Sequence, residues 1–121
     1  MVEKYKVQIT AVGKLAREFL ENNSSVILLN EGIHPNLSDM VVEHTVSELS
    51  EDVEVGDKLK IGNTDFKVVK VGDVANKTLR EEGHCTVVVN ADGSMPGQII
   101  VKGSMSPRLR IGDEVKFFKK S

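Results

Sequence analysis

Hydrophobic and polar residues alternate with a period of two in several short stretches of this chain. In the stretch MVVEHTVSE, residues 40–48, a strand would place Met40, Val42, His44 and Val46 on one face and mostly polar residues on the other. His44 is then a titratable ring on the face that a strand normally buries. Two interpretations are open: a structural histidine whose ring nitrogens are hydrogen-bonded, or a reactive histidine held in an apolar setting.

Similar patterns along the rest of the chain predict seven or eight short strands and two short helices. Apolar residues have helical spacing at 14–23 and again at 73–83, where Asp73 is the expected N-cap and Gly83 the expected stop. The remaining apolar runs are short and separated by turn residues, which is typical of strands. The expected strands are 5–13, 25–32, 40–49, 59–61, 66–69, 84–90, 98–103 and 108–118.

This order of elements predicts an all-β, or β-dominated, fold: a small closed or partly open barrel or sandwich with one or two short helices. The strands lie too close together in sequence for several βαβ crossovers. The 121 residues contain no linker and fit one domain, 1–121. One weak internal similarity, VEVGDKLKI at 53–61 and LRIGDEVKF at 109–117, indicates a turn that recurs before two strands.

Composition and charge narrow the possible functions. The formal net charge is −2, the pI is about 5.9 and only 4% of the residues are aromatic. These values argue against a barrel that binds nucleic acid through phosphate contacts and stacked bases. The single cysteine, Cys85, excludes an intrachain disulfide and a paired-cysteine metal site, which favours a reducing compartment. The pattern predicts neither an apolar leader nor a membrane-spanning run.

The candidate reactive side chains are three histidines and the cysteine. His34 precedes a proline in an expected loop, and its plainest interpretation is an exposed loop residue. His84 begins an expected strand. Cys85 is expected in the core, and His84 is a poor base for it because neighbours in a strand point to opposite faces. The sequence has no metal-ligand spacing and none of the common nucleotide-binding or hydrolase motifs.

The segment VKVGDVANKTLREEGHCTVVV, residues 69–89, is the most specific stretch. It resembles the glucitol/sorbitol-specific IIA component of the bacterial phosphoenolpyruvate-dependent sugar phosphotransferase system (PTS), a family with a Val-Gly-x-Val-Ala block followed by Leu-Arg-Glu-x-Gly-His. The turn at 31–32, the histidine strand and the terminal Gly-Asp-x-Val-Lys-Phe strand also fit, so the resemblance covers nearly the whole chain. The matching residues of the block are Val71, Gly72, Val74, Ala75, Leu79, Arg80, Glu81, Gly83, His84 and Thr86.

The resemblance implies a β-barrel-like phosphoryl carrier. Its phosphoryl-accepting histidine carries over to His44, with His84 and Thr45 as supporting candidates, whereas a second family histidine is replaced here by Val46. The implied partners are the phosphocarrier protein HPr as donor and the glucitol-specific IIB component of a membrane transporter as acceptor, in the cytoplasm and without a cofactor. Composition and pattern alone would favour a small β-barrel interaction module without covalent chemistry.

A phosphoryl-accepting His44 sets expectations for its surroundings. An apolar environment disfavours the charged imidazolium and keeps water from the phosphoryl bond. We therefore expect His44 in a partly open apolar depression, with Met40 and Val42 contributing to the surface that meets a partner. Thr45 would help to hold the transferred group, and His84 could instead hold the second ring nitrogen of His44.

Overall fold

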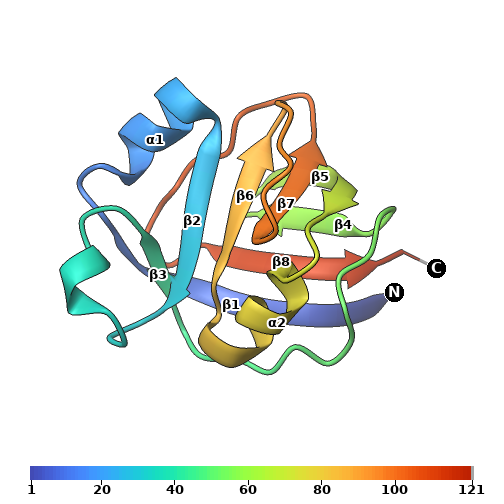
Figure 1. Cartoon of the computed structure of the whole chain (residues 1–121), viewed down its shortest axis with the longest axis horizontal. Helices are drawn as coiled ribbons and strands as arrows, with labels where there is room; N and C mark the ends of the chain where they lie inside the picture. The colour runs from blue at the N-terminus through green and yellow to red at the C-terminus, as the bar shows by residue number, and fades with distance from the viewer. Residues whose placement is uncertain (121) are drawn as a thin grey trace.

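The chain folds into a closed barrel of eight strands with two short helices (Figure 1). The computed structural model describes residues 1–120. Around the barrel, hydrogen-bonded neighbours follow the order β1-β3-β2-β6-β7-β5-β4-β8, and β8 pairs with β1. The elements are β1 Val2–Val12, α1 Ala16–Asn23, β2 Ser25–Asn30, the 3-10 turn η1 Pro35–Leu37, β3 Val42–His44, β4 Lys58–Ile61, β5 Thr64–Val71, α2 Ala75–Glu82, β6 Cys85–Val89, β7 Gln98–Lys102 and β8 Glu114–Lys119.

The β-dominated barrel predicted from the sequence is confirmed. Most neighbouring strands are antiparallel, but β2–β3 and β6–β7 are parallel. Each parallel pair is connected by an irregular segment, 31–41 or 90–97, rather than by a long helix. The barrel therefore contains two parallel pairs although its strands are too close in sequence for helical crossovers.

Two expected strands are shorter than predicted. The segment 40–49 is a regular strand only over Val42–His44. Beyond His44, only isolated backbone hydrogen bonds join it to β1, such as that from Thr45 N–H to the Gln8 carbonyl. Val46 is consequently exposed instead of lying on the buried face. The last strand begins at Glu114, after a turn, rather than at 108.

The expected cap of the second helix is wrong, and its expected end is right. Asp73 does not cap α2; the residue before the helix is Val74, and no side chain caps it. Backbone carbonyls replace such a cap, because Val74 N–H donates to Pro96 and Ala75 N–H donates to Gly72. Gly83 ends α2 with φ 62°, a conformation that glycine adopts without strain.

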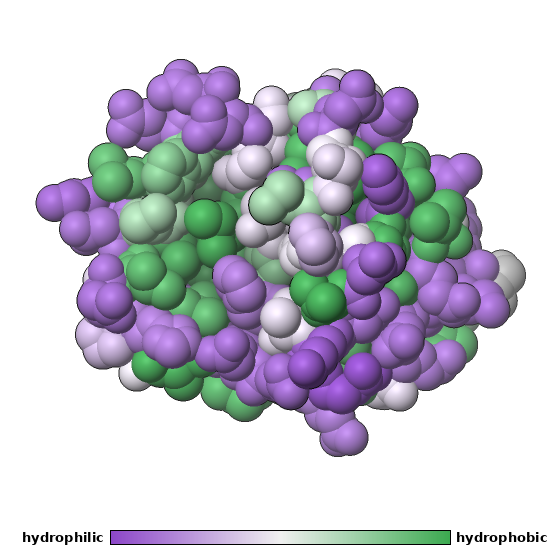
Figure 2. Space-filling view, in the orientation of Figure 1, coloured by the Kyte–Doolittle hydropathy of each residue, from purple (hydrophilic) through white to green (hydrophobic). Residues whose placement is uncertain are grey.

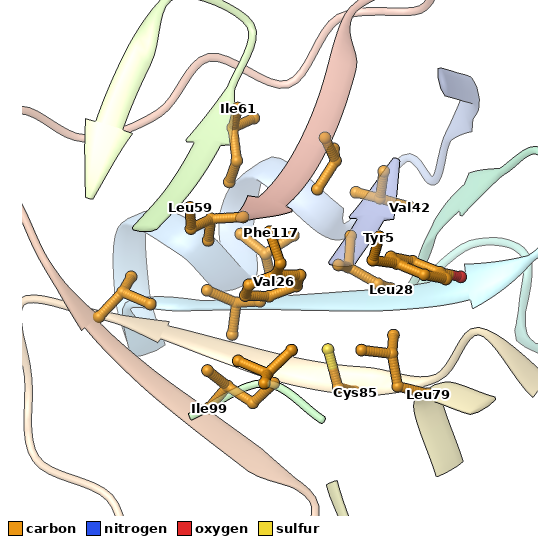
Figure 3. Close-up of a cluster of buried hydrophobic side chains, with 14 of the residues drawn as sticks. Tyr5, Val26, Leu28, Val42, Leu59, Ile61, Leu79, Cys85, Ile99 and Phe117 are labelled. Carbon is orange, nitrogen blue, oxygen red and sulfur yellow. The ribbon is translucent and has the colours of Figure 1, made fainter. Parts of the chain in front are cut away.

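The inward-facing side chains of the strands form one apolar core inside the barrel (Figure 3). In β4, for example, Leu59 and Ile61 are buried, while Lys58 and Lys60, which alternate with them, are only partly buried. Two charged side chains, Lys4 and Asp57, are buried as a pair, with Lys4 Nζ 2.8 Å from Asp57 Oδ2. Burial opposes the charge of Lys4, but hydrogen bonds and attraction from Asp57 and Glu54 outweigh that cost and raise the pKa of Lys4.

The barrel consists of two halves with the same order of elements. β1, α1, β2, β3 and β4 correspond to β5, α2, β6, β7 and β8. Exchanging the two sets reproduces the same ring of neighbours read in the opposite direction. The halves are therefore related by an approximate two-fold axis that passes between β2 and β6. In Figure 1, α1 and α2 accordingly lie at opposite ends of the β2–β6 pair.

Backbone contacts support this correspondence. Gly13 N–H donates to the Val41 carbonyl, and Gly72 N–H donates to the Gln98 carbonyl. A Cβ added to either glycine would overlap carbonyl oxygens of the facing loop, so both sites require close backbone approach. Each of these glycines precedes a helix of the same length.

The recurring Gly-Asp turn predicted from the sequence is confirmed as part of this repeat. Gly56 has φ 97° and Gly112 has φ 94°, and each is followed by one aspartate and then by β4 or β8. These two strands pair with each other in the barrel. The weak internal similarity thus reflects equivalent corners of the two halves.

Candidate functional site

His44 is the last residue of β3 and lies between β1 and β2, in register with Ile9 and Asn30. Its side chain is fully buried, at 0% exposure. The expectation of a partly open depression is therefore wrong, because the end of α2 covers the ring. Val42 is also fully buried, so it cannot contribute to a partner surface as expected.

Both ring nitrogens of His44 lie at hydrogen-bond distance from backbone carbonyl oxygens. Nδ1 is 2.8 Å from the oxygen of Thr45, and Nε2 is 2.9 Å from that of Gly83. The ring of Tyr5 packs against the imidazole edge to face, with 6.0 Å between the centroids. These contacts hold the imidazole in one orientation.

The two carbonyls cannot both be satisfied by a neutral ring. A neutral imidazole has one N–H and one lone pair, whereas a carbonyl oxygen only accepts. An imidazolium can donate to both, but in the neutral ring one nitrogen points its lone pair at an oxygen. Thr45 is anchored to β1 through Gln8, while Gly83 lies at the end of a short helix. The contact with Gly83 is therefore the one that a neutral ring weakens.

Residues 82–84, at the end of α2, contact or include each of the chain's three histidines. Gly83 contacts His44, and the preceding residue, Glu82, lies 2.7 Å from Nε2 of His34 through its Oε1 atom. His84 follows Gly83 directly. His34 is exposed, as expected for a loop residue, but it also joins the 31–41 loop to α2. Gly83 covers His44, and Glu82 and His84 attach this segment to the 31–41 loop and to β2; we call residues Glu82, Gly83 and His84 the α2 lid.

His84 does not hold the second ring nitrogen of His44, contrary to expectation. The carbonyl of Gly83 occupies that place, and Nδ1 of His84 lies 3.1 Å from the carbonyl oxygen of Leu28 instead. The ring of His84 thus binds β2, where it helps to attach the lid to the barrel.

Thr45 contacts His44 through its carbonyl rather than through a donor. Its hydroxyl accepts the N–H of Gln8 at 2.9 Å, and its own N–H donates to the Gln8 carbonyl at 2.9 Å. The Thr45 side chain is therefore directed toward β1. Its contribution to the site is to fix the Nδ1 side of the imidazole.

The other half of the barrel shows which side chains the fold itself requires at this place. Asn30 and His44 are in register across β2–β3, and the equivalent pair across β6–β7 is Val89 and Val101. Both valines are buried. A barrel wall can therefore be built here from two apolar side chains, so the imidazole and amide of the other half are not needed for packing.

The backbone carbonyl of the residue that follows each helix also makes different contacts in the two halves. Ser24 follows α1 in a left-handed conformation, as Gly83 follows α2. The carbonyl of Ser24 accepts the backbone N–H of Val89 at 2.8 Å, whereas that of Gly83 faces the side chain of His44. The half that contains His44 thus closes through a contact between a backbone carbonyl and a side chain.

Sequence reasoning missed two buried polar groups near His44. Oδ1 of Asn30 and the hydroxyl of Tyr5 are both buried without a hydrogen-bond partner. The available signal for Asn30 was a polar residue that ends the apolar run SVILLN. Tyr5 gave no such signal, because a tyrosine in an alternating strand is ordinary.

Residues 1–120 give little indication of a metal site or of a reactive cysteine. No group of three or more His, Cys, Asp or Glu side chains is arranged to hold a metal ion there. Cys85 is buried as expected, and burial raises the pKa of its thiol to about 12, which keeps it neutral. None of the helices in this part of the chain is both long and apolar enough to span a membrane.

The chain is similar to known proteins over nearly its whole length. Residues 4–116 match the family model of the PTS system glucitol/sorbitol-specific IIA component. The glucitol/sorbitol-specific EIIA components of Shigella flexneri and Escherichia coli K12 are each 29% identical over 115 residues, 93% of either chain. The crystal structure of a PTS system IIA component from Enterococcus faecalis V583 has the same fold, with a TM-score of 0.83, 24% identity and coverage of 94% of this chain and 99% of that one. This chain belongs to the glucitol/sorbitol-specific IIA family of the phosphotransferase system, whose members carry phosphoryl groups.

Proposed function

We propose that this protein carries its phosphoryl group on His44, receives it from the phosphohistidine of HPr and passes it to the glucitol-specific IIB component of a membrane transporter. The supporting observation is a buried histidine at a position where the other half of the barrel has Val101. Because packing does not require an imidazole there, a chemical role explains its presence. The exchange would take place in the cytoplasm and drive the uptake of a sugar alcohol.

The accepting atom is Nε2. In the neutral ring, Nδ1–H donates to the carbonyl of Thr45 and leaves the lone pair on Nε2. This lone pair attacks phosphorus in line with the N–P bond of the donor histidine. As the new bond forms, the old one breaks and its electron pair stays on the donor nitrogen. No proton is gained or lost, and transfer to the IIB component repeats the step with His44 as donor.

Transfer requires the α2 lid to move. Nε2 of His44 faces the carbonyl of Gly83, and the ring is wholly buried, so a donor cannot approach it in line. Repulsion between the Nε2 lone pair and this oxygen favours the movement when the ring is neutral. A docked partner then excludes the water that the lid excludes in the closed state, which protects the phosphoryl bond.

An apolar surface lies on the side of the molecule formed by α1 and the 31–41 loop (Figure 2). Leu15, Ile33, Leu37 and Met40 on these segments are 36–42% exposed. The 31–41 loop begins directly after Asn30 and is bound to the lid through His34. A partner that docks on this surface would lie beside the lid, in the manner of small and transient interfaces. Met40, but not Val42, keeps its expected role there.

The proposal is tested by phosphorylating the protein with phosphoenolpyruvate, enzyme I and HPr and measuring intact mass. We expect one acid-labile, base-stable phosphate on the wild type and none on His44→Ala. His34→Ala and His84→Ala serve as matched controls, because the first removes a ring that contacts the lid and the second a ring of the lid itself, and both leave Nε2 of His44 in place. Phosphate uptake by His44→Ala would overturn the assignment.

The alternative of an interaction module without covalent chemistry makes the opposite prediction. Such a protein would bind HPr or the IIB component, yet its mass would stay unchanged after incubation. A second incubation with the purified IIB component measures whether the phosphate leaves His44, as a carrier requires.

A further inference from the structure

We infer that Asn30 is a second residue of the phosphoryl site, whose side-chain amide donates a hydrogen bond to the phosphoryl group on His44. This inference rests on the proposed function and deepens it. The starting observation is that Asn30 is 9% exposed and that its Oδ1 is buried without a partner. A buried amide oxygen without a partner gives up its hydrogen bonds to water and gains none from the protein, which is unfavourable.

The position of Asn30 is fixed by the strand ladder. It is the last residue of β2 and is paired with His44, the last residue of β3. Residues paired in this way project their side chains to the same side of the sheet. The amide and the imidazole therefore border the same space at one end of the two strands.

Gly83 defines that space. A Cβ added to Gly83 would overlap Oδ1 of Asn30 and lie 2.6 Å from Cε1 of His44. Gly83 therefore lies against both the amide of Asn30 and the imidazole of His44, and a residue with a side chain would not fit there. When Gly83 withdraws from Nε2, the group that takes its place is next to the amide of Asn30.

The phosphoryl group needs donors, and the chain offers few others. Among residues 1–120, no lysine or arginine makes a hydrogen bond or ion pair with His44, Asn30 or Gly83. Thr45 uses its N–H on Gln8. An amide turned by half a rotation presents Nδ2 where Oδ1 now lies, with nearly the same shape. Asn30 can therefore donate to a phosphoryl oxygen once one is present.

A neutral donor suits a carrier. A lysine or arginine would neutralise the phosphoryl charge and hold the group firmly, whereas a carrier must release it to the next protein. An amide hydrogen bond stabilises the charge spread over the phosphoryl oxygens without trapping the group. Val89, the equivalent of Asn30 in the other half, shows that the fold itself accepts an apolar residue at this place.

The test compares Asn30→Val and Asn30→Asp with the wild type in phosphoryl transfer from HPr. Valine copies the residue of the other half, and aspartate keeps the shape of asparagine but replaces the N–H donors by a negative charge. We expect both variants to remain folded and to accept one phosphate on His44, but about 10- to 100-fold more slowly than the wild type. Asn30→Asp should be the slower of the two.

A second readout separates this role from a structural one. We expect Asn30→Val to unfold at the same or a higher urea concentration than the wild type, and the phosphohistidine of Asn30→Val to show a shifted ³¹P resonance. The matched control is Leu29→Val, which trims the neighbouring buried side chain and should lower stability without slowing transfer. Wild-type transfer rates in Asn30→Asp would overturn the inference. Failure of the wild type to accept phosphate would overturn the proposed function instead.

Discussion

The carbonyl oxygen of Gly83 lies 2.9 Å from Nε2 of His44. This contact joins the end of α2 to the end of β3 and buries the ring completely. A phosphoryl carrier with a buried acceptor must alternate between a closed and an open state, because attack on phosphorus needs in-line approach. In the proposed function, the closed state would protect His44 when no partner is docked, and only the end of a short helix would have to move.

Replacing Gly83 by alanine is expected to force the lid away from His44. The new Cβ would overlap Asn30, and the residue would keep a positive φ of 62°. We expect Gly83→Ala to lose about 2–3 kcal/mol of stability and its His44 to react faster with diethyl pyrocarbonate. Urea unfolding and mass spectrometry of the modified peptide measure the two effects.

Gly32→Ala is the matched control for that experiment. Gly32 also has a positive φ, 75°, but a Cβ there meets nothing within 4 Å. Gly32→Ala should lose only the stability that a side chain at positive φ costs, about 1 kcal/mol, and should leave the reactivity of His44 unchanged. Equal losses in the two variants, with His44 unreactive in both, would show that Gly83 does not cover the ring.

The hydrogen-bond contact between His34 and Glu82 is expected to hold the lid closed. Glu82→Ala removes it, while Asp52→Ala removes the comparable exposed pair of α2 with Arg80. Exposed pairs contribute up to about 1 kcal/mol, so Glu82→Ala should raise the open population up to about fivefold. Hydrogen exchange at the lid measures this change. If Asp52→Ala has the same effect, the pair with His34 has no special role.

Local patterns predict the strands well, because the alternation of apolar and polar side chains along a strand is a property of neighbouring residues. β2, β4, β6 and β7 were each expected close to their observed bounds. Strand order and the two parallel pairs depend on contacts between distant segments, which a local pattern does not contain. The repeat also leaves a trace in the sequence, because Val-Gly occurs at 12–13 and again at 71–72, but two residues are too short a match to predict it.

The sequence alone predicts His44 as the candidate acceptor, but it does not predict the surroundings of the ring. Alternation places His44 on the buried face, and the family resemblance proposes it as the acceptor. Its cover, Gly83, is 39 residues away in sequence. Asn30 could not be predicted as a site residue from local patterns either. The inference about it depends on its register with His44 and on the comparison with Val89 in the other half.

Removing the hydroxyl of Tyr5 is expected to stabilise the protein. The side chain is 1% exposed, and its hydroxyl is buried without a hydrogen-bond partner. Tyr5→Phe keeps the edge-to-face contact with His44 and removes an unpaired polar group, so we expect a gain of about 1 kcal/mol in the free energy of unfolding. A loss of stability in urea unfolding would instead mean that the hydroxyl has a partner in solution.

Stability is expected to fall as the pH rises above about 9, because two buried acids must stay protonated in the folded barrel. Burial raises the pKa of Cys85 from 9.0 to about 12, and burial, with a smaller effect of Cys85, also raises that of Tyr5. Both groups ionise more easily in the unfolded chain, so their contribution is complete below pH 9 and is lost between about pH 9 and 12. Each contributes a slope of up to about 1.4 kcal/mol per pH unit. Urea unfolding across this range should show a shallower decline in Cys85→Ala, and an unchanged slope there would contradict the role of the thiol.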